Sequence, residues 1–387
     1  MIKTITASSA DTDDIDLCVA DFQNQLDVKG ALKRRSIGLM FGPPETMEAA
    51  KVVCRAMPFD VIGCLTPLTT VNGVRRDSLC DAASLTMTVL TSDEAVFAAG
   101  LSDELGDDGR EAVTTLYEKL AAKLPRPPKL VLIFCSRDRP QGDHLVQWLD
   151  EASSGCPLTG CFSANYSFLL HEPDLLFNGQ LLERRVGLAL IDTDAEPAFL
   201  FISTPEAKRM RHRAVITASE GNLIKEINGR PVLDFLRSLN LIDHEGRLRG
   251  AMAVPIIVES PDCWRALPMV INALTEEGHV RCSLDLPSNA TLTLSSLERM
   301  DVIESMRRAT AIIKTKSFNL CLLFSCMGRN LALGFDYLQE IKELEAALGP
   351  RLPYCFAYSG GEICPIPDAE GRMRNAYHNL ALVVCLL

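Results

Sequence analysis

Three segments of this chain repeat one plan. Each opens with a short apolar run, passes through a stretch with helical spacing, and ends in a second apolar run. The copies cover residues 36–70, 129–167 and 319–363, and their opening runs are SIGLMF, KLVLIF and NLCLLF. Repeats of this kind are typical of strand-helix-strand units with parallel strands. The chain is therefore constrained to a fold that can hold three similar units.

A hydroxyl side chain recurs at one position of the repeat. When the second runs are aligned on Gly63, Gly160 and Phe356, a hydroxyl follows three residues later in every copy: Thr66, Ser163 and Ser359. Ligands bind beyond the carboxyl ends of parallel strands, which is where these side chains are expected. Ser and Thr also favour strand ends and turns in general. The register of three hydroxyls favours a shared site, although no reaction signature accompanies them.

Length and patterning predict an α/β fold with more than one domain. A chain of 387 residues exceeds the usual single-domain size. Asn178 and Gly179 between apolar runs predict a β-hairpin, which adds antiparallel strands to the repeated units. We expect two related domains of mixed sheets covered by helices, residues 1–205 and 206–387. Helices are expected over residues 13–25, 45–57, 107–124, 297–315 and 335–348, and a last strand over 376–386.

Charge and composition exclude some functions. The formal net charge is −11, and the one basic run, KRMRHR at 208–213, is short. Nucleic-acid binding needs a wider basic face, so we expect no nucleic-acid partner and interpret the run as a linker. The first residues lack the apolar core of a secretory signal, and no apolar run reaches the ~20 residues of a membrane span. These features predict a soluble, cytoplasmic protein with no membrane partner.

The 14 cysteines predict buried thiols. Most lie inside apolar runs, and no CxxC pair occurs. Neither a disulfide framework nor a zinc site is expected.

Candidate binding residues cluster in the third copy and its counterpart in the second. Gly361 lets the backbone approach a ligand, and Glu362 offers an acceptor or a counter-charge at the strand end. Arg329 follows the opening strand, where a guanidinium can clamp a carboxylate, and Arg137 holds the same place in the second copy. With Ser325, Ser359 and Ser163, these residues form the predicted ligand site.

Known catalytic patterns are missing from the sequence. No GxSxG, GxGxxG, Walker or HExxH pattern occurs, so no catalytic or metal residue is predicted. An uncharacterised enzyme stays an alternative that would need a base near Ser325 or Cys326. His378 provides another alternative, because a neutral imidazole can ligate haem iron.

The motifs CLLFSCMGR, FAYSGGEICP and YHNLALVV, together with EINGRPVLDFL, resemble the C-terminal half of FIST-domain proteins. GCLTPLTT and PLTGCFSANYSF resemble the N-terminal half more weakly. The resemblance implies a sensory module that binds a small ligand, an amino acid or related metabolite, and signals to a histidine kinase or cyclic-dinucleotide enzyme. We expect that partner to be a separate protein. One branch of this family resembles haem proteins that sense nitric oxide and regulate a kinase. The resemblance therefore implies haem as the alternative cofactor.

Departures from the family pattern fall on the predicted sites. Leu68 and Thr69 stand where the family has Gly and Glu, so the first copy lacks an acidic site. Phe356 and Gly360 replace a glycine and a tyrosine in the third copy. Because of these differences, the ligand of other family members cannot be assigned to this chain.

Overall fold

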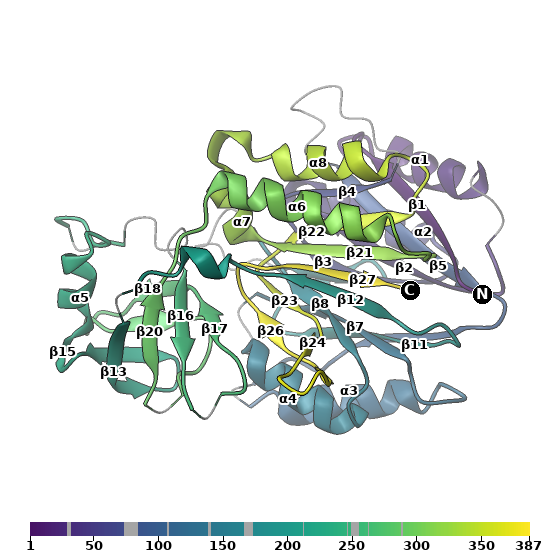
Figure 1. The fold of residues 1–387 in the computed structure, drawn as a ribbon. Coiled ribbons are helices and arrows are strands. Elements are labelled where there is room, and N and C mark those ends of the chain that lie inside the picture. Colours follow the sequence, from purple (N-terminus) through teal and green to yellow (C-terminus); the bar gives the residue numbers. More distant parts are fainter. Residues whose placement is uncertain are drawn as a thin grey trace.

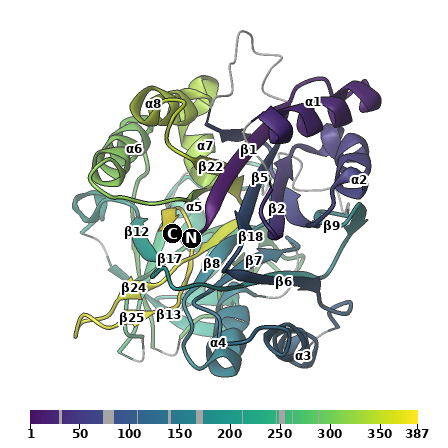
Figure 2. The same ribbon diagram turned by 90° about the vertical axis from the view of Figure 1, so that its right-hand side faces the viewer.

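Three similar units form the body of the molecule. The computed structural model describes residues 1–28, 32–72, 84–106, 108–137, 141–165, 173–211, 213–245, 247–248, 255–261, 263–287 and 289–387. Figure 2 shows three helix pairs, each at a different corner of the body, around strands that lie between them. We call the units that carry these pairs unit 1, unit 2 and unit 3.

Unit 1 provides the sheet order that the other units repeat. Strands β1, β5, β2 and β3 lie side by side, and only the β2–β3 pair is parallel. The helices cover one face of this sheet. The elements are β1 Lys3–Ser9, α1 Ile15–Val28, β2 Arg35–Gly42, α2 Met47–Ala56, β3 Asp60–Leu65, β4 Thr69–Val71 and β5 Leu85–Ser92.

Unit 2 has the equivalent order β6, β11, β7, β8, with β7 and β8 parallel. The predicted hairpin at Asn178–Gly179 is confirmed, and it joins β9 to β10. The elements are β6 Val96–Leu101, α3 Arg110–Ala121, β7 Leu130–Cys135, α4 Gly142–Ser153, β8 Leu158–Phe162, β9 Leu175–Phe177, β10 Gln180–Leu182 and β11 Val186–Asp192. Residues 166 and 167 of the second sequence repeat lie outside the described residues.

Unit 3 has the order β12, β27, β21, β22, again with one parallel pair, β21 and β22. The elements of its sheet and helices are β12 Ala198–Ile202, α6 Arg299–Ile313, β21 Cys321–Cys326, α7 Met327–Leu333, α8 Gln339–Leu348, β22 Tyr354–Ser359 and β27 Leu382–Leu386. Two short strands, β23 Gly361–Ile363 and β26 Tyr377–His378, and a small hairpin of β24 Ile366–Pro367 and β25 Met373–Arg374 complete it.

A small antiparallel lobe is inserted into unit 3 between β12 and α6. Figure 1 shows it at the left, beyond the end of the body where α7 lies. We call it the β lobe. Its strands run in the order β17, β16, β20, β13, β14, β19, β18. The elements are β13 Arg213–Glu220, β14 Leu223–Ile227, β15 Arg230–Pro231, α5 Val232–Ser238, β16 Ile256–Glu259, β17 Leu267–Met269, β18 Ile271–Leu274, β19 Val280–Cys282 and β20 Thr291–Leu294.

Short arms exchange between the units in a cycle. After its second parallel strand, each unit sends a three-residue arm to the sheet of another unit. The arm β4 of unit 1 pairs with β22, the arm β23 of unit 3 pairs with β8, and the arm β9 of unit 2 pairs with β3. Each sheet is therefore completed by a strand from a different unit.

Hydrogen bonds just beyond the parallel strands follow the same cycle. The amide of Ala164 donates to Leu65 O over 3.1 Å, and the amide of Gly360 donates to Phe162 O over 2.9 Å. The equivalent residue of unit 1 is Pro67, which has no N–H. The neighbouring hydroxyl takes over this role, because Thr66 Oγ1 donates to Tyr358 O over 2.7 Å.

Successive side chains of each strand point to opposite faces of the sheet, so they pack into two different cores, one at the centre of the body and one under the helices of the unit. One side chain per unit from the opening strand meets its equivalents at the centre: the Phe41 ring lies 5.8 Å from the Phe134 ring and 6.0 Å from the Phe324 ring. These rings belong to one buried cluster that all three units share. The intervening side chains face the helices of their own unit, as Met40 does beside α2.

These arrangements confirm the predicted α/β class with mixed sheets covered by helices and repeated strand-helix-strand units. The boundary near residue 205 stays a prediction. Two local expectations were wrong. The helix expected from Phe335 begins at Gln339, and Phe335 lies fully exposed on a 3₁₀ turn. The last strand is broken at Leu380, whose φ of 56° turns the chain from β26 in one sheet to β27 in another.

We expect Thr66→Val to lower the free energy of unfolding by about 1–2 kcal/mol, because Tyr358 O then loses its donor from unit 1. Thr159→Val is the matched control. Thr159 is also fully buried, but its hydroxyl has no partner in the part of the chain that the structure describes. Urea denaturation should show little change or a gain for the control. Equal losses in both variants would contradict the bridging role of Thr66.

Candidate functional site

A cavity of about 1190 Å³ lies where the sequence places a site, beyond the carboxyl ends of parallel strands. Residues that follow β7, β8, β21 and β22 line it from the body. The β lobe covers it from the other side with residues of β18 and β19. The cavity therefore lies between units 2 and 3 and the lobe that is inserted into unit 3.

Unit 2 contributes two of the predicted residues. Ser163 follows β8 directly, and its hydroxyl makes a long contact of 3.3 Å to Leu65 O. Arg137 follows β7, and its backbone amide donates to Asp174 Oδ2 over 2.8 Å. Burial raises the pKa of Asp174. Both Ser163 and Arg137 line the cavity, so the structure brings these two predictions together.

The charges along the cavity wall are mostly positive, although the chain is acidic. The described lining contains three arginines, Arg110, Arg137 and Arg281, and one aspartate, Asp108. Arg110 is ion-paired with Glu151. Arg281 of the β lobe is exposed, and no described carboxylate forms an ion pair with it. Apolar side chains such as Trp148, Val270 and Met327 line the remaining wall. A molecule with an apolar body and an anionic group matches this lining.

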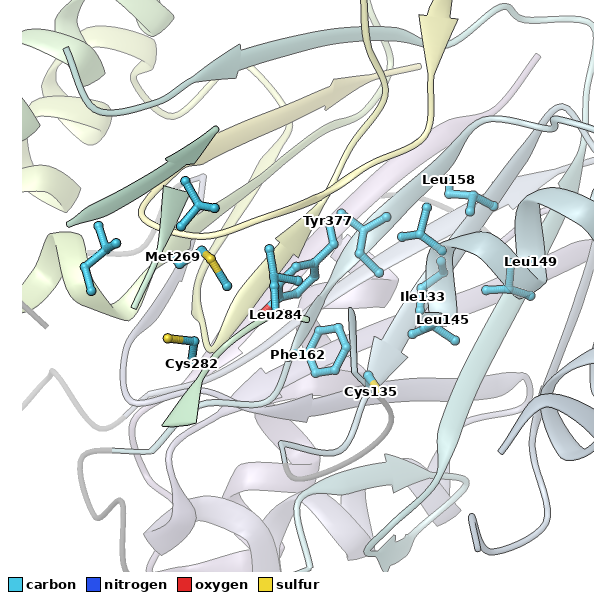
Figure 3. Close-up of a cluster of buried hydrophobic side chains, with 14 of the residues drawn as sticks. Ile133, Cys135, Leu145, Leu149, Leu158, Phe162, Met269, Cys282, Leu284 and Tyr377 are labelled. Carbon is cyan, nitrogen blue, oxygen red and sulfur yellow. The ribbon is translucent and has the colours of Figure 1, made fainter. Parts of the chain in front are cut away.

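Tyr377 forms part of the cavity floor in a tightly defined position. Its ring packs edge-on against Phe162, with the centroids 5.3 Å apart. A Cβ at Gly361 would overlap the Tyr377 hydroxyl, and a Cβ at Gly142 would overlap its ring. Figure 3 shows Tyr377 and Phe162 between the side chains of unit 2 and those of the lobe, such as Met269. Gly361 thus serves the close packing of Tyr377.

Glu362 and Ser359 lie together beneath the floor. Both are fully buried, and Ser359 Oγ lies 2.5 Å from Glu362 Oε1. The amide of Ala381 donates to Glu362 Oε2 over 3.4 Å. Burial raises the pKa of Glu362 to about 8. Neither side chain is part of the cavity wall, but Gly360 between them is.

Arg329 and Ser325 lie in a separate buried network. Arg329 Nη2 is 2.6 Å from Glu340 Oε1 and 2.7 Å from Ser305 Oγ. Ser325 Oγ donates to Glu340 Oε2 over 2.9 Å. The hydroxyl of Tyr358 donates to the same oxygen. The structure therefore brings Arg329 and Ser325 together, but not with the cavity. Their role in ligand binding stays a prediction.

His378 does not fit a haem ligand in this structure. Its Nε2 lies 2.9 Å from Cys364 O, and its Nδ1 lies 3.1 Å from Arg265 Nη1. A carbonyl can only accept, so Nε2 carries the proton and Nδ1 accepts from Arg265. Burial, followed by Arg265, lowers the pKa of His378 well below its usual value. Both nitrogens are engaged, so haem ligation would require breaking one of these bonds.

Neither of the two residues named for the enzyme alternative, Ser325 and Cys326, is an activated nucleophile. Ser325 is fully buried, and the carboxylate beside it, Glu340, is ion-paired with Arg329. Cys326 lines the cavity, but burial raises the pKa of its thiol well above the usual range. The enzyme alternative stays a hypothesis.

Sequence reasoning missed the lobe side of the cavity. Arg281 and Asn272 lie on antiparallel strands outside the repeats and were not among the predicted site residues. Tyr377 and Asn379 flank His378 in the YHN motif that was singled out for its histidine. That motif was the signal that could have placed the last strand at the site.

Comparisons with known proteins identify the family. The FIST N domain matches residues 36–230, and the FIST C domain matches residues 233–365. The chain belongs to the FIST family, whose domains are associated with sensing and signal transduction.

No curated protein matches the chain in sequence. Among solved structures, the crystal structure of cyanuric acid hydrolase from A. caulinodans is similar at a TM-score of 0.35 and 9% identity. That alignment covers 100% of this chain and 98% of the hydrolase. This similarity is too low to support a conclusion on activity.

No group of His, Cys, Asp and Glu side chains in the described ranges could hold a metal ion. Among the helices of those ranges, none is long and apolar enough to cross a membrane.

Glu362 should make stability depend on pH in a defined direction. Its pKa is about 8 in the fold and near its ordinary value, about 4.5, in the unfolded chain. Between these values the folded state holds a proton that the unfolded state has lost. The free energy of unfolding therefore falls as the pH rises through this window, by at most about 1.4 kcal/mol per pH unit.

Glu362→Gln mimics the protonated form, because a carboxamide can donate to Ser359 and accept from the Ala381 amide. Between about pH 5.5 and 7.5 we expect the wild type to lose about 2 kcal/mol relative to this variant, measured by urea denaturation. Glu340→Gln is the control, since it breaks an ion pair and should destabilise the fold at both pH values. Identical pH slopes for wild type and Glu362→Gln would contradict the prediction.

Proposed function

We propose that this protein is a sensor that binds a small amphipathic anion in the cavity and transmits the signal to a separate protein. The observation that carries the proposal is the cavity itself, which is lined by Arg137 from the body and Arg281 from the β lobe. A ligand held by both arginines would connect two parts of the molecule.

An amino acid or a related metabolite is the ligand class that we favour. Its carboxylate suits a guanidinium, and Ser163 and Asn379 offer hydroxyl and amide groups to its remaining polar atoms. Trp148 and Val270 would cover an apolar side chain. The family association with signal transduction supports an output through a partner, for which a histidine kinase or a cyclic-dinucleotide enzyme is our candidate.

The β lobe is the element that we propose to transmit binding. It is joined to the body by two chain crossings, which include residues 203–211 and 295–298, and it forms one wall of the cavity. A ligand that contacts both walls stabilises the arrangement with the lobe closed. The population of that arrangement then depends on ligand concentration.

We expect Arg281→Ala to weaken binding by about 10- to 100-fold, because the ligand loses a charge-assisted hydrogen bond. A panel of amino acids and small carboxylates, screened by thermal shift and followed by calorimetry, measures this. Arg230→Ala is the control, since Arg230 is an exposed arginine of the same lobe outside the cavity lining. Full affinity in Arg281→Ala would place the ligand elsewhere.

A further inference from the structure

The β lobe is attached to the body by a second connection, far in sequence from its two chain crossings. Arg265 lies in the loop between β16 and β17, and its Nη2 donates to Tyr377 O of the body. Its Nη1 donates to Nδ1 of the next residue, His378, over 3.1 Å. One lobe arginine therefore binds a backbone oxygen and a ring nitrogen of β26.

The acceptors of Arg265 are fixed by the body. The proton on His378 Nε2 donates to Cys364 O, which leaves the Nδ1 lone pair directed at the lobe. The Phe201 ring packs on the imidazole with the centroids 4.3 Å apart. His378 is also paired with Glu362 across β23 and β26. The imidazole is thus a prepared acceptor and has no freedom to follow the lobe.

The next residue adds a third bond to the same connection. Asn379 Nδ2 donates to Pro268 O of the lobe over 3.2 Å, and Asn379 Oδ1 accepts from the Tyr377 hydroxyl over 3.3 Å. Three consecutive body residues, Tyr377–Asn379, therefore bind the lobe. Two of them, Tyr377 and Asn379, also line the cavity. The segment that binds the lobe is therefore part of the cavity wall.

Other contacts between lobe and body are either exposed or apolar. His144 of α4 lies 3.1 Å from Asp285, and both side chains are more than a third exposed. Val270 packs with Cys326 and Leu380. Near the chain crossings, Lys208 pairs with Glu298 at the surface. Among the described residues of this interface, Arg265 is the charged side chain that is half-buried and bound to two acceptors. Burial lowers its pKa to about 10.

We propose that Arg265 and the segment Tyr377–Asn379 form a latch that holds the β lobe closed over the cavity and controls access to it. The control of ligand binding rests on the proposed function, whereas the latch itself does not. In this view the HN motif provides the acceptor and the donor that the lobe engages.

Cys326 reports on the latch without any ligand. It is 5% exposed, lines the cavity and belongs to the same buried cluster as Val270 of the lobe. Cys321 begins the same strand, β21, but is buried among side chains of α6 and α8. Opening of the lobe exposes Cys326 and leaves Cys321 covered. Global unfolding exposes both.

The test measures alkylation of the two thiols by N-ethylmaleimide, resolved by peptide mass spectrometry, in the full-length protein without added ligand. We expect Arg265→Ala to speed alkylation of Cys326 about tenfold or more, with Cys321 unchanged, because the rate follows the open population. Arg265→Lys, which keeps the charge without the planar two-bond geometry, should give an intermediate rate. It also serves if the alanine variant does not fold.

Arg372→Ala is the matched control. Arg372 is an exposed arginine of the body, and its guanidinium pairs with Asp368 and Glu370 of the body. This variant should match the wild type. Unchanged Cys326 alkylation in both Arg265 variants, or equal acceleration at Cys321, overturns the latch. Because no ligand is present, this result is independent of whether the amino-acid panel finds a binder.

Discussion

Cyclic exchange of arms between the three units is the constraint on which the rest of the structure depends. Each sheet would end at the exposed edge of its second parallel strand without the arm of a neighbour. The arms close the cycle from unit 1 to unit 3, from unit 3 to unit 2, and from unit 2 to unit 1. No unit has a complete sheet alone. The carboxyl ends of all the parallel strands are therefore held together, and the cavity is formed at that end.

Two buried carboxylates of unit 3 have partners of different kinds. Glu340 lies on a helix of unit 3 and finds its counter-charge, Arg329, within that unit. Glu362 lies on the arm β23, and its partners, the Ser359 hydroxyl, the Ala381 amide and the Cys326 thiol, also belong to unit 3. A carboxylate without a cation in a buried site retains its proton, in accordance with its raised pKa. The arm thus places a group that prefers to be neutral at the junction of two units.

The repeats could be predicted from the sequence because their strands carry long apolar runs. The arms could not, since three residues have no periodicity to recognise. Among the candidate site residues, Ser163 and Arg137 line the cavity that the strand ends predict. Arg329 was placed correctly at a strand end, but its partner Glu340 is brought to it only by the turn at Gly334, with a φ of 60°. Such a pairing depends on three-dimensional folding.

Asymmetry among the units determines which strand-end hydroxyl lines the cavity. In unit 1 the Thr66 hydroxyl hydrogen-bonds the carbonyls of Leu68 and Tyr358. It replaces the backbone donor that Pro67 lacks. In unit 3 Ser359 is occupied by Glu362. Ser163 of unit 2 contacts Leu65 O at 3.3 Å and the buried Asp174 carboxylate, and it lines the cavity.

The β lobe is inserted into unit 3 yet covers the strand ends of unit 2, so one of three similar positions becomes a site. The lobe is attached there by the segment that follows the third arm. The position of the latch at β26 is therefore a consequence of the arm exchange, since β26 joins the sheet of unit 2 only because β23 has already entered it.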